Sequence, residues 1–298
     1  MGRPYLLLAF LASVPVAAQS NRVFVSALSG NDANACNNIA TPCHTFQGAV
    51  SQVASGGSIL VLTTGGYGAV TINKALTIEA PTNVIAFIHP SSGDAITVNV
   101  GASDTVVLRG LSLNVGAGNG IVFWGGTLQV ERCVLNGFVN AILHQSNGLL
   151  IVKDSTIRNS NYGIRMDAAS PTGTRAVVER TRIKGNQNGV FVYNGVLVLH
   201  ASNVSGNSAA GVFAYGVGGG AAPDVTVEDC LIAHNGDGAD SWGTSGGIAT
   251  LRVSNSTIVY NVFGLDQFDG GTLLSRTDNT VEGNTVDTSG TISSYFPK

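Results

Sequence analysis

One short phrase recurs along the chain between residues 128 and 264, and it constrains the fold more than any other feature. Each copy alternates apolar and polar residues, passes through a small residue to an aliphatic one, and is followed by a bend. The copies are VERCVL (130–135), VKDSTI (152–157), VERTRI (178–183), LHASNV (199–204), VEDCLI (227–232) and VSNSTI (253–258). An apolar residue at every second position predicts a strand with one buried face.

The spacing of the copies predicts how these strands connect. Their fourth letters are Cys133, Ser155, Thr181, Ser202, Cys230 and Ser256, so successive copies lie 21 to 28 residues apart. This step is too long for a hairpin and too short for a strand–helix–strand unit. It fits one turn of a parallel coil of three short strands, in which each turn pairs with the next about 4.8 Å away. We therefore predict one solenoid domain over residues 19–298, with repeats from about 58 to 285 and a tail at 286–298.

A series of Asn residues follows the phrase at a fixed offset. Three residues after the aliphatic letter stand Asn186, Asn207, Asn235, Asn261 and Asn284. Asn tolerates a left-handed backbone, and its amide can bond to equivalent residues in the turns above and below. A Gly follows each of several bends, as Gly163, Gly189, Gly211, Gly238 and Gly264. Such regular repetition indicates architecture and not an active site.

The stretch before the repeats has its own order. A helix is predicted from Thr41-Pro42 to Gly56-Gly57, with its apolar residues on one face. A strand at 59–62, Gly65-Gly66-Tyr67 and a first full turn at 70–78 follow. A second early turn is predicted at 106–113, with a longer excursion around 81–93.

Together with the repeats, this order resembles the right-handed parallel β-helix, or pectin-lyase-like, superfamily over residues 40–285. The resemblance implies an all-β, right-handed, single-stranded parallel β-helix. It also implies that the helix within 41–57 caps the first open turn. The tail is expected to cover the last turn or to fray.

The N-terminus is typical of an exported protein. Arg3 precedes an apolar run over residues 5–18 that is short for a membrane span, and small residues end it at Ala18. We expect cleavage after Ala18 and a secreted or periplasmic protein; a short buried helix is the alternative. The formal charge of −3 indicates no binding to nucleic acid, and no later segment is apolar for long enough to insert into a membrane.

The four Cys residues fall into two groups. Cys36 and Cys43 lie seven residues apart in a Gly- and Asn-rich loop, where a disulfide is predicted for an oxidising compartment. A metal site is the alternative, but only His44 lies nearby. Cys133 and Cys230 occupy one repeat position four turns apart, about 19 Å, which is too far for a disulfide. We predict that both are buried free thiols.

Two columns of side chains are predicted to point outward after the bend glycines. The first outward column contains Arg165, Phe191, Phe213, Asp240 and Asp266, and the second contains Asp167, Tyr193, Tyr215, Trp242 and Phe268. The chain has 11 Phe, 7 Tyr and 2 Trp, so six aromatic residues in ten neighbouring positions are a concentration. Aromatic faces along a groove suit sugar rings. The alternative is that the rings stack between turns and stabilise the coil.

Carboxylates in the same region suggest chemistry. Asp240 and Asp266 would lie about 5 Å apart on successive turns, a separation that suits a retaining glycosidase pair. They could also hold Ca²⁺, with Asp237 and Asp269 as further ligands, or be solvated loop carboxylates. Arg165 and Asp167 could assist catalysis. No cofactor is otherwise required.

Motifs of the superfamily's enzymes are missing. Arg182-Ile183-Lys184 spells the R-I-K tripeptide of polygalacturonases, but their N-T-D, D-D and G-H-G elements are absent. The R-x-P-x-x-R pattern of pectate lyases and the D-P-H-E pattern of alginate epimerases are also absent.

Two hypotheses remain open. The first is a non-catalytic secreted protein that binds an extended polysaccharide, neutral or acidic, or serves in adhesion through its aromatic face. The second is a polysaccharide lyase or glycoside hydrolase that uses the carboxylates. The sequence leaves the oligomeric state open.

Overall fold

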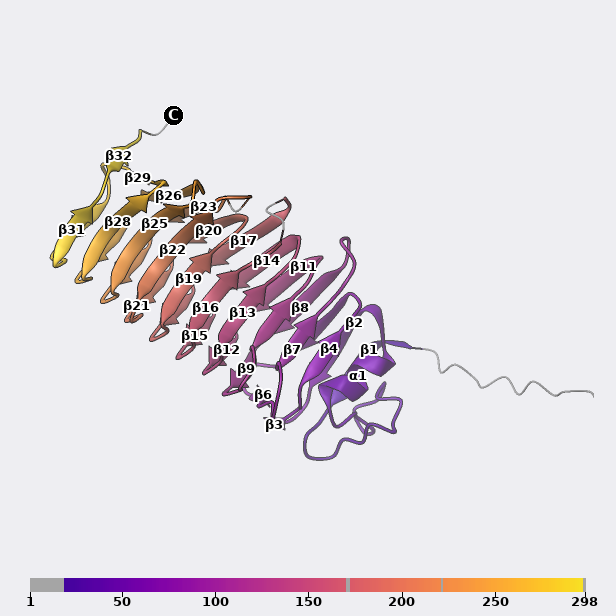
Figure 1. Cartoon of the computed structure of the whole chain (residues 1–298). Coiled ribbons are helices and arrows are strands. Elements are labelled where there is room, and N and C mark those ends of the chain that lie inside the picture. Colours follow the sequence, from indigo (N-terminus) through magenta and orange to yellow (C-terminus); the bar gives the residue numbers. More distant parts are fainter. Residues whose placement is uncertain (1–18, 170–171, 221, 297–298) are drawn as a thin grey trace, which may run out of the picture.

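The computed structural model describes residues 19–169, 172–220 and 222–296. The predicted signal segment, residues 1–18, lies outside the described residues. The chain winds as an elongated coil of strands, coloured in sequence order from one end to the other in Figure 1. Each full turn contributes one strand to each of three parallel sheets, as the spacing of the repeats predicts.

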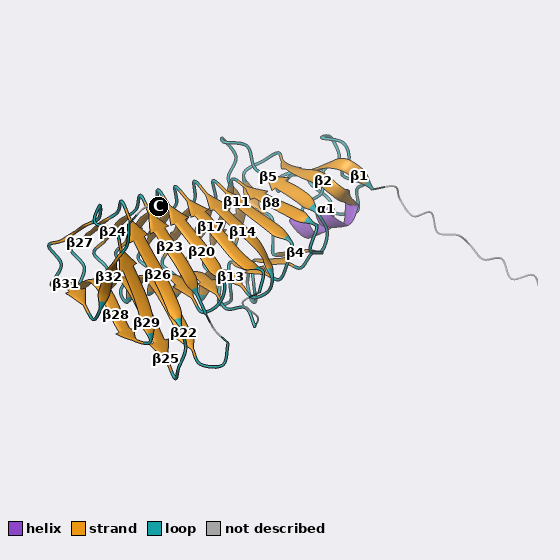
Figure 2. Ribbon diagram, turned by 90° about the horizontal axis from the view of Figure 1, so that it is seen from above, coloured by secondary structure: helices purple, strands orange, loops and turns teal. Residues whose placement is uncertain are grey.

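The first sheet, sheet A, has twelve strands. They are β1 (Ser20–Val25), β2 (Val53–Val61), β5 (Leu76–Glu79), β8 (Thr105–Arg109), β11 (Thr127–Glu131), β14 (Gly148–Lys153), β17 (Thr174–Glu179), β20 (Val196–His200), β23 (Asp224–Glu228), β26 (Ala249–Ser254), β29 (Gly271–Ser275) and β32 (Ile292–Ser294). Several of them are seen side by side in Figure 2.

Sheets B and C have ten strands each. Sheet B consists of β3 (Gly65–Gly66), β6 (Ala86–Ile88), β9 (Leu111–Asn114), β12 (Val134–Asn136), β15 (Thr156–Arg158), β18 (Arg182–Lys184), β21 (Asn203–Ser205), β24 (Leu231–Ala233), β27 (Thr257–Val259) and β30 (Thr280–Glu282). Sheet C consists of β4 (Val70–Ile72), β7 (Ile96–Val98), β10 (Ile121–Phe123), β13 (Asn140–His144), β16 (Tyr162–Met166), β19 (Asn188–Val192), β22 (Ala210–Val217), β25 (Asp237–Thr244), β28 (Phe263–Asp269) and β31 (Val286–Ser289).

Equivalent letters of the phrase stack directly on one another. The backbone N–H of Thr181 donates to Ser202 Oγ at 3.1 Å, and the N–H of Arg182 donates to the carbonyl of Ser155 at 2.9 Å. Cys133 and Cys230 are buried free thiols in the same column, as predicted. Burial raises the pKa of both thiols to about 11. At neutral pH both are therefore protonated and unreactive, and they serve only to pack the interior.

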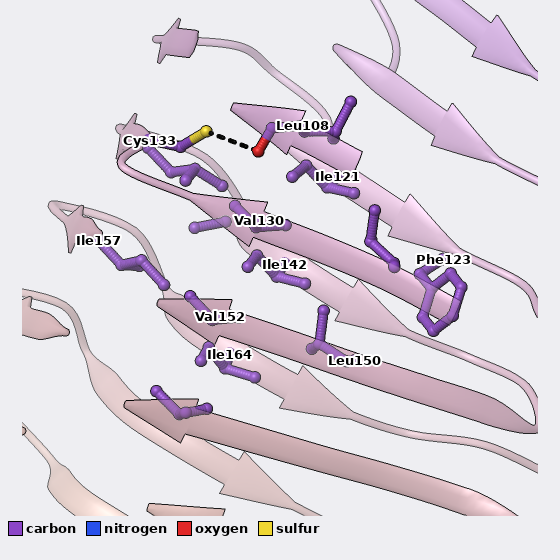
Figure 3. Close-up of a cluster of buried hydrophobic side chains, with 14 of the residues drawn as sticks. Leu108, Ile121, Phe123, Val130, Cys133, Ile142, Leu150, Val152, Ile157 and Ile164 are labelled. Atoms are coloured by element: carbon purple, nitrogen blue, oxygen red, sulfur yellow. Dashed lines mark hydrogen bonds between the residues drawn. The ribbon is translucent and has the colours of Figure 1, made fainter. Parts of the chain in front are cut away.

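The interior is a stack of apolar rows. Figure 3 shows Val130 and Val152 of neighbouring strands above one another, with Ile142 and Ile164 forming a second row opposite. All four side chains are completely buried. One face of most strands is therefore removed from water, which is the main source of stability for a coil of short strands.

The predicted Asn series forms a continuous hydrogen-bonded ladder at the bend between sheets B and C. Asn186, Asn207, Asn235 and Asn261 are all buried. In each pair of neighbouring turns, Oδ1 of the Asn in the later turn accepts two hydrogen bonds from the Asn in the earlier turn. One comes from its backbone N–H and the other from its side-chain amide, at 2.9–3.0 Å. The ladder satisfies polar groups that a tight bend would otherwise leave buried without partners.

The N-terminal helix is shorter than predicted. Helix α1 (Phe46–Gln52) begins after Thr45, whose hydroxyl accepts from the N–H of Gly48, and it ends because Val53 is already extended. The predicted end at Gly56-Gly57 was wrong, since both glycines lie in β2. The helix lies at the N-terminal end of the coil against β1, β2 and β4 (Figure 1); its role as a cap stays a prediction.

The predicted disulfide is confirmed in the loop before this helix. Cys36 and Cys43 are bonded, with their Cα atoms 5.1 Å apart.

Two predictions about the ends of the coil need correction. The excursion around 81–93 was predicted by treating Leu76 and Leu111 as equivalent positions one turn apart, and this was wrong. Leu76 pairs with Val106 in sheet A, whereas Leu111 pairs with Ala86 in sheet B. The supposed excursion around 81–93 therefore contains an ordinary strand, β6. The tail is also more regular than expected, since β31 and β32 continue sheets C and A.

No helix among the described residues is both long and apolar enough to cross a membrane.

Candidate functional site

The first outward column runs along the outer face of sheet C. Arg165 pairs with Phe191, Phe191 with Phe213, Phe213 with Asp240, and Asp240 with Asp266. The segment 241–247 therefore does not shift the register at Asp240. Strands also lengthen here, from five residues in β16 and β19 to eight in β22 and β25, which extends this outer face (Figure 2).

The second outward column lies beside the first and is longer than the sequence suggested. Tyr215 pairs with Trp242, and Trp242 with Phe268. In the other direction the column continues from Tyr193 and Asp167 through Gln145 to Trp124, because the strands before them are in register. The repeat phrase begins only at residue 128, so it gave no signal for Trp124. The strand pattern of 121–123, which places residues 122 and 124 on one face, could have found it.

A cavity opens over this extended part of the second outward column. Its volume is about 650 Å³. Trp124, Gln145, Asp167 and Tyr193 contribute to its lining from four successive turns, together with Ala168, Ala169, Asn194 and the loop Gly218–Gly220. A cavity of this size, with aromatic rings at its ends and an amide and a carboxylate between them, has the form of a small-molecule or oligomer site. Hereafter we call it the groove.

Arg165 ties the two columns together next to the groove. Its guanidinium Nη2 lies 2.5 Å from Asp167 Oδ2, and its Cζ lies 5.0 Å and 5.7 Å from the ring centroids of Tyr162 and Phe191. The ion pair fixes the Asp167 carboxylate at the edge of the groove and offsets its charge. Both side chains are about one-third exposed, so they can contact a ligand.

The six predicted aromatic residues form one connected cluster. Ring centroids are 5.3 Å apart for Phe191 and Phe213, and 5.4 Å apart for Tyr215 and Trp242 as well as for Trp242 and Phe268. Most of the rings are half-buried in one another, so they stabilise the coil as the alternative interpretation predicted. Trp124 and Phe268 are 44% and 55% exposed, and Tyr193 faces the groove. Ring contacts and an accessible aromatic surface therefore coexist.

Asp240 points outward, but it is only 7% exposed. Its Oδ1 is buried and has no hydrogen-bond partner among the residues that the structure describes. Burial, together with the nearby carboxylates of Asp237 and Asp266, raises the pKa of Asp240 to about 8. Burial and Asp266 also raise the pKa of Asp237 to about 6. Two carboxylates directly opposite each other on neighbouring strands cannot both ionise cheaply, so Asp240 is protonated at neutral pH.

The four carboxylates predicted to bind a metal do not form a ligand set. Within the ranges that the structure describes, no three His, Cys, Asp or Glu side chains are grouped so that they could hold a metal ion. Asp269 instead accepts a hydrogen bond from Trp242 Nε1 at 3.0 Å. Asp237, Asp240, Asp266 and Asp269 share one region of the surface, but a shared region is less than the convergence of oxygen atoms that Ca²⁺ requires.

The predicted catalytic residues also do not meet at one point. Arg165 and Asp240 stand three turns apart in the first outward column, which is about 14 Å at the usual strand spacing. Arg165 and Asp167 therefore belong to the groove, whereas Asp240 and Asp266 form a separate acidic pair. The sequence placed all four on one face but could not resolve this separation.

We predict that Asp240→Asn changes the pH dependence of stability. The folded-state pKa of Asp240, about 8, lies above the ordinary value of 3.8, so the protonated carboxyl stabilises the folded state. This stabilisation is fully present below about pH 4 and is lost as the pH rises through about 8. Asn mimics the protonated form. The free energy of unfolding of the variant relative to the native protein should therefore rise by a few kcal/mol between pH 5 and pH 8 in urea titrations.

The comparison with the native protein is necessary because His144 has the opposite effect. This side chain is fully buried, and burial lowers its pKa to about 4, so its contribution grows between about pH 4 and pH 6.5 in both proteins. Parallel stability profiles for the native protein and Asp240→Asn would contradict the protonated state of Asp240.

The fold and the repeats define a parallel β-solenoid whose outer face on sheet C carries the two outward columns. The profile of the family described as "Right handed beta helix region" matches residues 88–222 and 119–286. The chain therefore belongs to the right-handed β-helix family, as its resemblance implied.

Solved structures agree with this fold. Alginate lyase from Paenibacillus sp. str. FPU-7 is similar at 13% identity and a TM-score of 0.68, over 92% of this chain and 100% of that one. Pectate lyase Pel9A is similar at 15% identity and a TM-score of 0.56, over 93% and 78% of the two chains. The Dettilon tailspike protein has a TM-score of 0.51 at 13% identity, over 83% and 54% of the two chains. No curated protein sequence matches the chain.

Proposed function

We propose that this protein is a secreted module that binds an extended polysaccharide along the second outward column of sheet C. The observation that carries the proposal is the groove of about 650 Å³, lined by Trp124, Gln145, Asp167 and Tyr193 on four successive turns and continued by the aromatic cluster. Flat rings spaced along a groove can stack on successive sugar rings. The Asp167 carboxylate, the Gln145 amide and the Asn194 side chain supply polar groups for hydroxyls.

An acidic polysaccharide is the preferred ligand class. Two of the structurally similar proteins are lyases of alginate and pectate, which makes these two polymers the first probes. Arg165 beside the groove supplies a cation that could pair with a ligand carboxylate in place of Asp167. The disulfide between Cys36 and Cys43 supports an oxidising, extracytoplasmic location.

Binding should weaken at least tenfold when two adjacent rings of the second outward column are removed. Tyr193→Ala with Tyr215→Ala deletes two adjacent rings, whose centroids lie 6.2 Å apart. Each lost stacking contact is worth about 1 kcal/mol or more. Calorimetric titration with alginate and pectate measures the effect.

Phe87→Ala is the matched control, because this phenylalanine is 39% exposed and lies on β6 of sheet B, outside the two outward columns. Retention of full affinity by the double variant would overturn the proposed binding surface.

The second candidate function is cleavage of a glycan by the acidic pair. Asp240 favours it, because a buried carboxyl kept protonated at neutral pH can donate a proton to a leaving oxygen. Asp266, on the adjacent strand, would be the paired carboxylate at the separation of a retaining glycosidase.

Incubation with alginate and pectate, with and without Ca²⁺, followed by detection of unsaturated products and new reducing ends, tests this second function. Turnover that is unchanged in Asp240→Asn would exclude the assignment.

A further inference from the structure

A second cavity, far from the groove, lies at the corner where sheet B bends towards sheet C. Its volume is about 440 Å³. Arg158, Lys184 and Ser205 line it from the neighbouring strands β15, β18 and β21. The bend after those strands supplies the other side of the cavity, and His234 closes one end. We call this cavity the basic pocket.

The two cations of the basic pocket face each other without a partner. Arg158 and Lys184 are directly opposite on adjacent strands, an arrangement in which like charges repel and destabilise a sheet. In the described part of the chain, no carboxylate lies within ion-pair distance of either side chain. Arg158 Nε is buried with no hydrogen-bond partner. A buried guanidinium N–H without an acceptor is costly unless a ligand provides one.

On sheet A, by contrast, charged residues that lie directly opposite each other have opposite signs. Arg109 Nε lies 2.8 Å from Glu131, and Lys153 Nζ lies 3.1 Å from Glu179, in each case between directly opposite residues of adjacent strands. Glu131 in turn faces Lys153, so the column alternates in sign. Arg158 and Lys184 differ from these pairs because two residues of the same charge lie directly opposite each other.

The bend next to the cations has been left open by two glycines. Gly185 and Gly206 both have φ of +65°, and the equivalent positions one turn away on either side carry the side chains of Asn159 and His234. Asn159 and His234 adopt nearly the same left-handed backbone, with φ of 56° and 58°. Larger residues can therefore occupy this position, and the two glycines leave the space that forms the floor of the basic pocket.

We infer that the basic pocket is an oxyanion-binding site that takes a carboxylate or sulfate group of an acidic glycan. An oxyanion would accept from Arg158 and Lys184 together and relieve their mutual repulsion. Ser205 and His234 add further donors at the rim. The glycan as carrier rests on the proposed function, whereas the oxyanion site rests on the pocket alone.

Arg158→Gln combined with Lys184→Gln tests the site. The matched control is Arg180→Gln combined with Arg252→Gln, which removes the same formal charge from residues that are paired with Asp154 and Asp224. Inorganic sulfate at low millimolar concentration, alginate and heparin are the probes, titrated by calorimetry at constant ionic strength. We expect the pocket variant to lose at least tenfold in affinity for sulfate and for one of the two glycans, while the control variant retains both.

The pattern of losses separates this inference from the proposed function. If alginate binding depends on the pocket, the carboxylate is the bound group. If heparin binding depends on the pocket and alginate binding does not, the sulfate is the bound group, since heparin carries both kinds of group. If the pocket variant binds every probe as well as the native protein does, the oxyanion site is refuted, even where Tyr193→Ala with Tyr215→Ala abolishes glycan binding. If sulfate requires the pocket but neither glycan binds, the glycan carrier is refuted and the oxyanion site is supported.

Discussion

Asn207→Ala should lower the free energy of unfolding by about 4 kcal/mol, because it removes several buried hydrogen bonds at once. Asn207 Oδ1 accepts from both the backbone N–H and the side-chain amide of Asn186 at 3.0 Å. Its own amide donates to Asn235 Oδ1 at 2.9 Å and to the carbonyl of Ile183 at 3.4 Å. Truncation leaves these groups of the neighbouring turns in a region closed to water, and each unsatisfied group adds its own cost. Urea denaturation of the two proteins measures the difference.

Asn136→Ala is the matched control for this change. Asn136 lies in β12, is only half-buried, and accepts a single side-chain bond, from Asn159, so its loss should cost less than about 1 kcal/mol. Equal effects of the two substitutions would mean that the buried ladder does not hold the turns together.

Gly189→Ala is expected to destabilise the coil by about 3 kcal/mol, through overpacking. A Cβ built at Gly189 would lie 2.5 Å from the carbonyl oxygen of Gly211 in the next turn. That atom is backbone and is held in the strand ladder, so it cannot move away as a flexible side chain could. The same close approach recurs along the column, with 2.5 Å between a Cβ at Gly163 and the carbonyl of Gly189, and 2.7 Å for Gly211 and Gly238. Glycine is required in this column because neighbouring turns approach each other too closely for a Cβ atom, and not because the backbone has a positive φ.

Gly101→Ala provides the comparison, since its Cβ would meet only the carboxylate of Asp104 at 3.1 Å, which is the end of a half-buried side chain. We expect a loss below about 1 kcal/mol there. Thermal unfolding of both variants measures the contrast, and an unchanged midpoint for Gly189→Ala would show that the turns can separate freely at this column.

The sequence predicted those parts of the fold that repeat. The phrase ending at Ile183 and Val204 fixed both the three-strand turn and the position of the Asn ladder, because every equivalent residue meets the same neighbours. The early turns were harder. Leu76 and Leu111 look alike as letters, but they belong to different sheets, and nothing local in the sequence distinguishes the first strand of a turn from the second.

For the candidate site, the sequence predicted the two outward columns but not the burial of Asp240 or the walls of the groove. Alternation within each strand placed Tyr193, Asp240 and Asp266 on one outer face, since it depends on the backbone alone. The depth of Asp240 depends on how large neighbouring side chains lie over it, and the walls of the groove at Gly218–Gly220 depend on loop conformation. Neither is encoded in a repeat. The opposed cations Arg158 and Lys184 became visible only through strand register.

Intrinsic tryptophan fluorescence tests the central claim, that the second outward column is the glycan-binding surface, most directly. The chain has 2 Trp residues, and Trp124 and Trp242 lie near the two ends of this column. Titration of the native protein, Trp124→Phe and Trp242→Phe with a glycan whose binding calorimetry has established should change the emission of at least one tryptophan at the calorimetric affinity. A glycan that binds at that affinity while the emission of both tryptophans stays constant would contradict the account.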